Sequence, residues 1–170
     1  MTLKSLATSA TLAALLLGAP ALAADTWKVD PVHSSVIFKV KHLGVSNFYR
    51  GFNDVSGTIV LDEASPEKSS IELTVKTDSV DTREPKRDQH LKSADFFSAK
   101  QFPTITFKSK EIAKSGDDWS VKGDLTLHGV TKEVTTKFAR TGTGPGMQKE
   151  MRTGGEATFT IKRGDFGMTF

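Results

Sequence analysis

The sequence contains no cysteine among its 170 residues. The chain can therefore form no disulfide, and its stability has to come from the burial of apolar side chains. The same absence excludes a thiol nucleophile and thiolate ligands for a metal. Tyrosine is nearly absent as well, with one residue against 11 phenylalanines, so most of the aromatic side chains carry no hydroxyl.

The sequence has no marked excess of charge of one sign. Lys and Arg number 23, Asp and Glu number 20, and the formal net charge is +3. The two signs are interspersed, without a long run of either. Because nucleic-acid binding requires a concentrated basic surface, we expect no nucleic-acid partner.

Sequence motifs of several enzyme classes are also missing. There is no G-x-S-x-G turn of the hydrolases, no glycine-rich phosphate loop and no dinucleotide fingerprint. The adjacent His33 and Ser34 make a poor base and nucleophile, since neighbouring residues on a strand point to opposite faces. We therefore expect a protein that is not an enzyme and that has no cofactor.

The first 23 residues are typical of an export signal. Lys4 gives a positive start, Ala10–Leu22 is apolar, and Ala21–Ala23 is a small-x-small cleavage site. The apolar run is too short for a secure membrane span. We expect cleavage after Ala23, a periplasmic location without stable membrane insertion, and one domain over residues 24–170.

Apolar and polar residues alternate along most of the remaining chain. A period of two predicts antiparallel strands with one apolar and one polar face. Turn signals separate the strands at Glu63–Pro66, Ser115–Asp118, His128–Gly129 and Thr141–Gly146. Seven or eight such strands in one domain predict an all-β sandwich or barrel, and the pattern does not choose between them.

The apolar parity of these strands is predicted to face the interior. A barrel of about eight strands either fills its interior with its own side chains or encloses one small ligand, and the excess of phenylalanine fits both outcomes. This register places Lys39, Lys76 and Lys122 on the outer face. The predicted inward residues are Val36, Phe38, Val40, Ile59, Ile71, Leu73, Phe107, Val121, Leu125, Phe138 and Phe159.

One stretch, Thr82–Phe97, interrupts the strand pattern with charges, a histidine and an aromatic pair. Arg87–Lys92 follows a proline and is predicted to form a short helical turn. Leu91 and the pair Phe96–Phe97 would anchor this turn to the core. The stretch is either a lid or ligand mouth, or a long surface connection held by its apolar residues.

Five groups of fragments stand out along the chain: Asp30–Ser34 with Val36–His42; Phe48–Phe52 with Val55–Gly57; Arg87–Leu91 with Asp95–Phe97, Phe102–Pro103 and Phe107–Ser109; Gly123–Lys132; and Arg163–Met168. In this order they resemble the YceI-like family of exported bacterial proteins that bind polyisoprenoids. The resemblance implies a single lipocalin-like antiparallel barrel with an elongated apolar cavity, lined by the inward residues given above. It also implies a periplasmic binding or carrier role for a polyprenyl or quinone-type lipid.

The end of the sequence departs from the family pattern. Members usually continue beyond the Asp-Phe-Gly motif into a final strand, whereas this sequence stops at Phe170. We expect that the final strand is truncated here or that the barrel is left open along one seam. An open seam presents unpaired backbone groups to the solvent.

Arg87, Asp88 and His90 are candidates for contact with a lipid head group at the mouth. An arginine supplies fixed donors for phosphate oxygens, and a neutral quinone head needs only a donor such as His90. The alternative is an ion pair between Arg87 and Asp88 that holds the helical turn. None of the four histidines shows a ligand spacing such as H-E-x-x-H, so we expect no metal site.

The predicted function is therefore a periplasmic binding or carrier protein for a long-chain isoprenoid lipid. Two alternatives stay open. One is an accessory enzyme or factor that acts on an isoprenoid or quinone head group. The other is a stress-related protein-interaction module of the cell envelope, with a filled barrel and no ligand.

Overall fold

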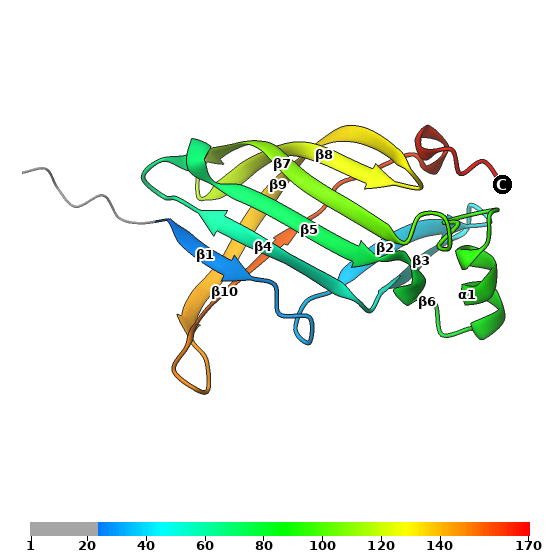
Figure 1. Cartoon of the computed structure of the whole chain (residues 1–170), viewed down its shortest axis with the longest axis horizontal. Helices are drawn as coiled ribbons and strands as arrows, with labels where there is room; N and C mark the ends of the chain where they lie inside the picture. Colours follow the sequence, from blue (N-terminus) through cyan, green and yellow to red (C-terminus); the bar gives the residue numbers. More distant parts are fainter. Residues whose placement is uncertain (1–23) are drawn as a thin grey trace, which may run out of the picture.

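The computed structural model describes residues 24–170 of the chain, and the predicted export signal, residues 1–23, lies outside them. Ten strands run through this part of the chain, and one short α-helix precedes the seventh strand (Figure 1). The helix is α1 (Pro85–Lys92). The strands are β1 (Asp25–Lys28), β2 (Val36–His42), β3 (Ser46–Phe52), β4 (Val55–Leu61), β5 (Ser70–Lys76), β6 (Val80–Asp81), β7 (Thr104–Ser115), β8 (Asp118–Leu127), β9 (Val130–Pro145) and β10 (Met151–Ala157).

The strands form two sheets. Seven strands pair antiparallel in the order β1-β4-β5-β7-β8-β9-β10, and β2, β3 and β6 form a second sheet of three. The small sheet stands beside the end of the large one where α1 lies (Figure 1). The result is a nearly closed antiparallel barrel with one short helix, which confirms the predicted all-β barrel and helical segment.

Strand β8 shows most clearly how the sequence pattern becomes an inside and an outside. Its residues alternate strictly, with Trp119, Val121 and Leu125 buried and the residues between them partly exposed. Lys122, on the opposite parity, forms an ion pair at 3.1 Å with Glu133 of β9, which is the ladder partner of Asp124. Since paired residues on adjacent strands share a face, this register extends across the large sheet.

The connection between β8 and β9 is a tight two-residue turn. Leu127 pairs with Val130, and the residues between them, His128 and Gly129, have φ angles of +53° and +74°. Two consecutive positive φ angles are typical of the hairpin turns that match strand twist, and glycine adopts them without strain. The hairpin predicted at this dipeptide is confirmed.

The large sheet ends at two edges, β1 and β10, which no backbone ladder joins in the described part of the chain. Side chains bridge the gap instead. Arg152 of β10 donates to the carboxylate of Asp30, which follows β1, at 2.8 Å. Arg140 of β9 reaches Glu63, beyond the end of β4, also at 2.8 Å. The barrel is therefore held together here by exposed ion pairs, which contribute little stability individually.

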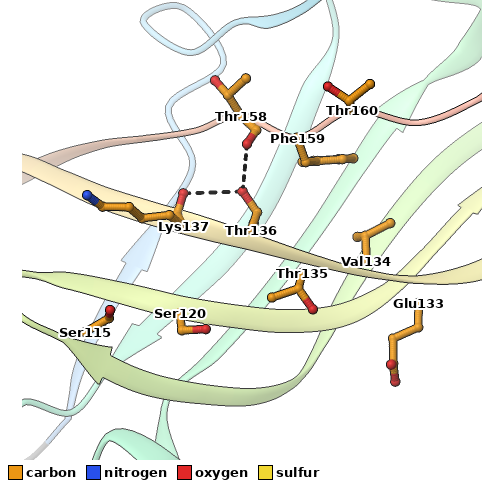
Figure 2. A pocket seen from close by; sticks show the side chains of 10 residues that line it. All are labelled: Ser115, Ser120, Glu133, Val134, Thr135, Thr136, Lys137, Thr158, Phe159 and Thr160. Carbon is orange, nitrogen blue, oxygen red and sulfur yellow. Dashed lines mark hydrogen bonds between the residues drawn. The ribbon is translucent and has the colours of Figure 1, made fainter.

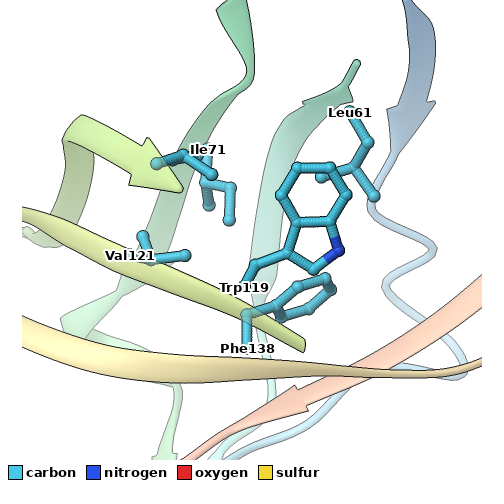
Figure 3. Close-up of a cluster of buried hydrophobic side chains, with 6 residues drawn as sticks. Leu61, Ile71, Trp119, Val121 and Phe138 are labelled. Carbon is cyan, nitrogen blue, oxygen red and sulfur yellow. The ribbon is translucent and has the colours of Figure 1, made fainter. Parts of the chain in front are cut away.

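Buried apolar side chains gather in three clusters. The first lies under the large sheet and is shown in Figure 3. The second, here called the small-sheet cluster, lies between the small sheet, β4 and β5, and the third lies under the β8–β9 hairpin. Their buried members are Leu61, Ile71, Ile112, Trp119, Val121 and Phe138 in the first, Phe52, Val55, Val75 and Val80 in the second, and Leu125, Leu127, Phe166 and Met168 in the third.

Helix α1 begins where the sequence places its start signals. Pro85 is at the first helical position, where the missing N–H costs nothing, and the side chain of Glu84 accepts a hydrogen bond from the backbone of Lys86. Leu91 is half-buried and packs on the small-sheet cluster together with Phe97. Leu91 and Phe97 thus anchor this segment as predicted, whereas Phe96 packs against His90 and Phe170 outside the core clusters. This helix, the one α-helix in residues 24–170, is too short to cross a membrane.

Candidate functional site

A hollow on the side of the barrel lies where the ladder between β9 and the C-terminal segment is interrupted. From Phe138 onward β9 pairs with β10, but its first half, residues 130–137, pairs with β8 alone. The chain after β10 runs past this free edge without a ladder. Between the two lies a groove of about 630 Å³, here called the β9 groove (Figure 2). Its lining residues are Ser115, Ser120, Glu133, Val134, Thr135, Thr136, Lys137, Thr158, Phe159 and Thr160.

One side-chain hydroxyl spans the β9 groove. The Thr136 hydroxyl lies 3.2 Å from the carbonyl oxygen of Thr158 and 3.3 Å from that of Lys137, and it can donate to either (Figure 2). Val134 and Phe159 contribute apolar surface from the two walls. The groove is therefore a mixed polar and apolar opening along the side of the barrel, and not an enclosed tunnel.

Nine of the 11 residues predicted to face inward are buried or partly buried. Those with little exposure are Ile71, Val121, Leu125 and Phe138. Those that stay partly accessible are Val36, Phe38, Ile59, Leu73 and Phe107. Lys39 and Lys76 are exposed, in line with the predicted register. That these side chains line a ligand site stays a prediction.

Two predicted inward residues are not enclosed. Val40 is 47% exposed because the β2–β3 hairpin extends beyond the body of the barrel, and its tip residues Leu43 and Val45 are also exposed. Phe159 is 42% exposed because it follows the end of β10, where no ladder holds the chain against β9. The enclosed position predicted for Val40 and Phe159 is wrong, although Phe159 lines the β9 groove.

Arg87 and Asp88, two of the predicted mouth residues, converge on the buried Thr82. The Arg87 guanidinium donates from Nε to the Thr82 hydroxyl at 2.8 Å and from Nη2 to the Thr82 carbonyl at 2.9 Å. The Asp88 carboxylate accepts from the backbone N–H of Thr82 at 2.8 Å and from its hydroxyl. Both side chains thus fix the junction between β6 and α1, without the direct ion pair that the sequence left as the alternative.

His90, the third mouth candidate, lies apart from Thr82. Its Nε2 atom is 3.0 Å from the Asp95 carboxylate, and its ring packs edge-on against Phe96 at 5.0 Å between centroids. The side chain is 47% exposed. The structure therefore brings together Arg87 and Asp88 but not His90.

Sequence analysis missed a further pair of residues at this end of the molecule. Phe48 and Arg50 lie on β3, and the Arg50 and Arg87 guanidinium carbons lie 4.5 and 4.8 Å from the centroid of the same Phe48 ring. The shared parity of Phe48, Arg50 and Phe52 on one strand could be read from the sequence, but the contact of Arg87 with Phe48 depends on how α1 packs against β3.

Asp30 and His33 form a polar cluster near the gap between β1 and β10. The hydrogen bond from His33 is the main reason why the pKa of Asp30 is lowered from 3.8 to about 2, and the backbone N–H of Val32 and the side chain of Arg152 add to it. The cluster is exposed. It ties the connection after β1 to β10, which is a structural role.

His128 holds the C-terminal segment in place. Its Nδ1 atom lies 2.9 Å from the carbonyl oxygen of Phe166, which can only accept, so the ring donates. Phe102 packs edge-on against the same ring at 4.9 Å. Phe166 is 2% exposed.

No three His, Asp or Glu side chains in residues 24–170 gather closely enough to hold a metal ion.

Comparison with known proteins identifies the family. The model of the YceI-like domain matches residues 27–170. The chain belongs to the YceI-like family. A UPF0312 protein of Pseudomonas aeruginosa is 41% identical over 167 residues, which cover 97% of this chain and 87% of the relative. A UPF0312 protein of Pectobacterium atrosepticum is 40% identical over 169 residues, 98% of this chain and 88% of the relative.

Solved structures of YceI-like proteins share the fold. The YCEI protein of Campylobacter jejuni is 36% identical, with a TM-score of 0.66 over 82% of each chain. BcnA of Burkholderia cenocepacia is 26% identical, with a TM-score of 0.73, and the match covers 81% of this chain and 83% of BcnA. The barrel of this chain is thus a fold that it shares with both solved structures.

Proposed function

We propose that this YceI-like protein binds a long-chain isoprenoid lipid, of the polyprenyl or quinone type, and carries it in the periplasm without acting on it chemically. One observation carries the proposal. Five apolar residues of the inward parity (Val36, Phe38, Ile59, Leu73 and Phe107) pack against the core clusters but keep part of their surface accessible. Apolar surface that faces a barrel interior and stays accessible is surface that a hydrocarbon ligand can cover.

Burial of the hydrocarbon chain supplies the binding energy. Each methylene removed from water contributes about 0.8 kcal/mol, so the five carbons of one isoprene unit contribute about 4 kcal/mol. Four buried units contribute about 16 kcal/mol, which exceeds the roughly 4–15 kcal/mol that association and ordering cost. The β9 groove is the route of entry in this proposal, because it opens the side of the barrel next to Val134 and Phe159.

A charge placed on the inward face tests the proposal. Phe38 is partly buried on β2 and packs against the ring of Phe52, with ring centroids 5.8 Å apart. Phe38→Asp introduces an unpaired carboxylate that resists dehydration by several kcal/mol. We expect the folded variant to lose binding of a radiolabelled polyprenol in gel filtration.

The neighbouring position supplies a matched control. Ile37 lies on the same strand, points outward and is 66% exposed. Ile37→Asp makes the same kind of change outside the barrel and is expected to retain the polyprenol as the wild type does. Circular dichroism establishes that both variants fold. Equal binding by Phe38→Asp and Ile37→Asp would show that the inward face of β2 is not part of the lipid site.

A further inference from the structure

Two positively charged side chains share one aromatic ring at the end of the barrel that carries α1. Arg50 comes from β3 and Arg87 from α1, and their guanidinium carbons lie 4.5 and 4.8 Å from the centroid of the Phe48 ring. Each cation is attracted to the ring, but the ring does not neutralise either charge. Two like charges are therefore held close together by contacts to an uncharged group.

Arg50 stands on the inward face of the small sheet. It pairs with Phe38 across β2 and β3, and residues paired in this way share a face. Along β3 it falls between Phe48 and Phe52, which have the same parity, and Phe52 is 7% exposed in the small-sheet cluster. The positively charged Arg50 side chain thus lies directly beside Phe38, which belongs to the proposed lipid site.

Hydrogen bonds to neutral oxygens fix the position of both guanidinium groups. The Thr82 carbonyl accepts from Arg50 Nε at 2.8 Å and from Arg87 Nη2 at 2.9 Å, and the Thr82 hydroxyl accepts from Arg87 Nε at 2.8 Å. Arg50 Nη1 also donates to the carbonyl of Tyr49. Each guanidinium has five N–H groups, and these contacts use only two of them on each side chain.

The nearby carboxylates are engaged elsewhere. None of the ion pairs within residues 24–170 involves either guanidinium. Asp88 accepts from the backbone and hydroxyl of Thr82. Asp81 accepts from the backbone N–H of Arg83 at 2.8 Å and from the side chain of Asn53 at 3.0 Å. Besides the backbone N–H of Arg83, the charge of Arg50 helps to lower the pKa of the Asp81 carboxyl, but neither guanidinium is used up by an ion pair and both keep free N–H donors.

We propose that Arg50 and Arg87 bind the phosphate group of an isoprenoid lipid, an inference that rests on the proposed function and names its ligand class. Arginine presents a planar set of donors that matches the oxygens of a phosphate, and two arginines balance the charge of a phosphate monoester. The small-sheet cluster would receive the first isoprene units, while the charged group meets the two guanidinium groups. A neutral polyprenol offers no charge to this pair, so the site discriminates between the two head groups.

The test compares two ligands of equal chain length, a polyprenyl phosphate and the corresponding polyprenol, by equilibrium binding at low salt. The wild type is expected to bind the phosphate at least about tenfold more tightly, the size of effect that one charged hydrogen bond gives. Arg50→Gln and Arg87→Gln should each remove most of this preference and leave polyprenol binding unchanged. Inorganic phosphate should compete with the polyprenyl phosphate only.

Lys86→Gln is the matched control, because Lys86 is an exposed cation next to Arg87 on α1 that makes no contact with Phe48. It is expected to keep the full preference for the phosphate. Arg87 is exposed on α1, so Arg87→Gln serves as the main variant if Arg50→Gln does not fold.

Three outcomes distinguish a failure of the proposed phosphate site from a failure of the proposed lipid binding. Equal binding of both ligands by the wild type overturns the phosphate site and leaves lipid binding in place. An equal loss of both ligands in the two variants also overturns it, since the arginines would then only brace Thr82. Failure of the wild type to bind either ligand contradicts the proposed function itself.

Discussion

Trp119 offers the sharpest test of the core, because its surroundings have two opposite effects on the free energy of unfolding. The side chain is fully buried and packs in the first cluster against Leu61, Ile71, Val121 and Phe138 (Figure 3). Its indole Nε1–H is buried without a hydrogen-bond partner. Packing favours the tryptophan, whereas the unpaired N–H opposes it.

Two substitutions separate the two effects. Trp119→Ala removes the whole ring, and the loss of burial together with the cavity left behind costs about 4 kcal/mol. Trp119→Phe keeps most of the apolar contact and removes the unpaired N–H, whose burial costs about 1–3 kcal/mol. The smaller ring sacrifices about 1–2 kcal/mol of burial. We therefore expect the stability of Trp119→Phe to lie between about 1 kcal/mol below and about 2 kcal/mol above that of the wild type.

Urea denaturation followed by far-UV circular dichroism measures both free energies of unfolding. The reasoning requires a large loss for Trp119→Ala and a small change of either sign for Trp119→Phe. Should Trp119→Phe lose as much stability as Trp119→Ala, the indole N–H must have a partner. A loss below about 1 kcal/mol for Trp119→Ala would remove Trp119 from the core.

Two further predictions concern backbone packing and pH. A Cβ at Gly123 would lie 2.5 Å from the carbonyl oxygen of Lys108, so Gly123→Ala should lower the free energy of unfolding in urea by about 1–3 kcal/mol. Gly144→Ala should be tolerated, because no atom lies within 4 Å of a Cβ at that position. Equal losses in the two variants would contradict the close approach at Gly123. The lowered pKa of Asp30 means that its contribution to stability is present above about pH 4 and is lost as the pH falls through about 2. In an NMR titration Asp30 should have a midpoint near 2 that rises toward 3.8 in His33→Ala, and an unchanged midpoint would exclude the His33 hydrogen bond as the main cause.

The strand pattern predicted much of the fold because alternation is a local property. In β8 the sequence places Trp119, Val121 and Leu125 on one face, and the structure buries all three. The helical turn at Arg87–Lys92 could be predicted from its proline and its apolar anchors, and α1 begins only two residues earlier, at Pro85.

Other features depend on which strands become neighbours, which alternation does not encode. Nothing in the sequence of β2 says that it pairs with β3, which in turn pairs with β6, instead of joining the large sheet. Phe159 continues the alternation of β10, yet the ladder ends at Ala157 and leaves it 42% exposed. The pairing of Arg50 with Arg87 over Phe48 joins residues far apart in the chain, so no local pattern reveals it.

Native mass spectrometry of the wild-type protein purified from the periplasm of an expressing bacterium tests the central claim most directly. The account predicts a fraction of the protein with an added mass that matches one isoprenoid lipid, and recovery of the same lipid by organic extraction. Phe38→Asp should appear at the mass of the polypeptide alone. A wild-type protein that carries no lipid, and that takes up no polyprenol or polyprenyl phosphate when these are supplied, would contradict the account.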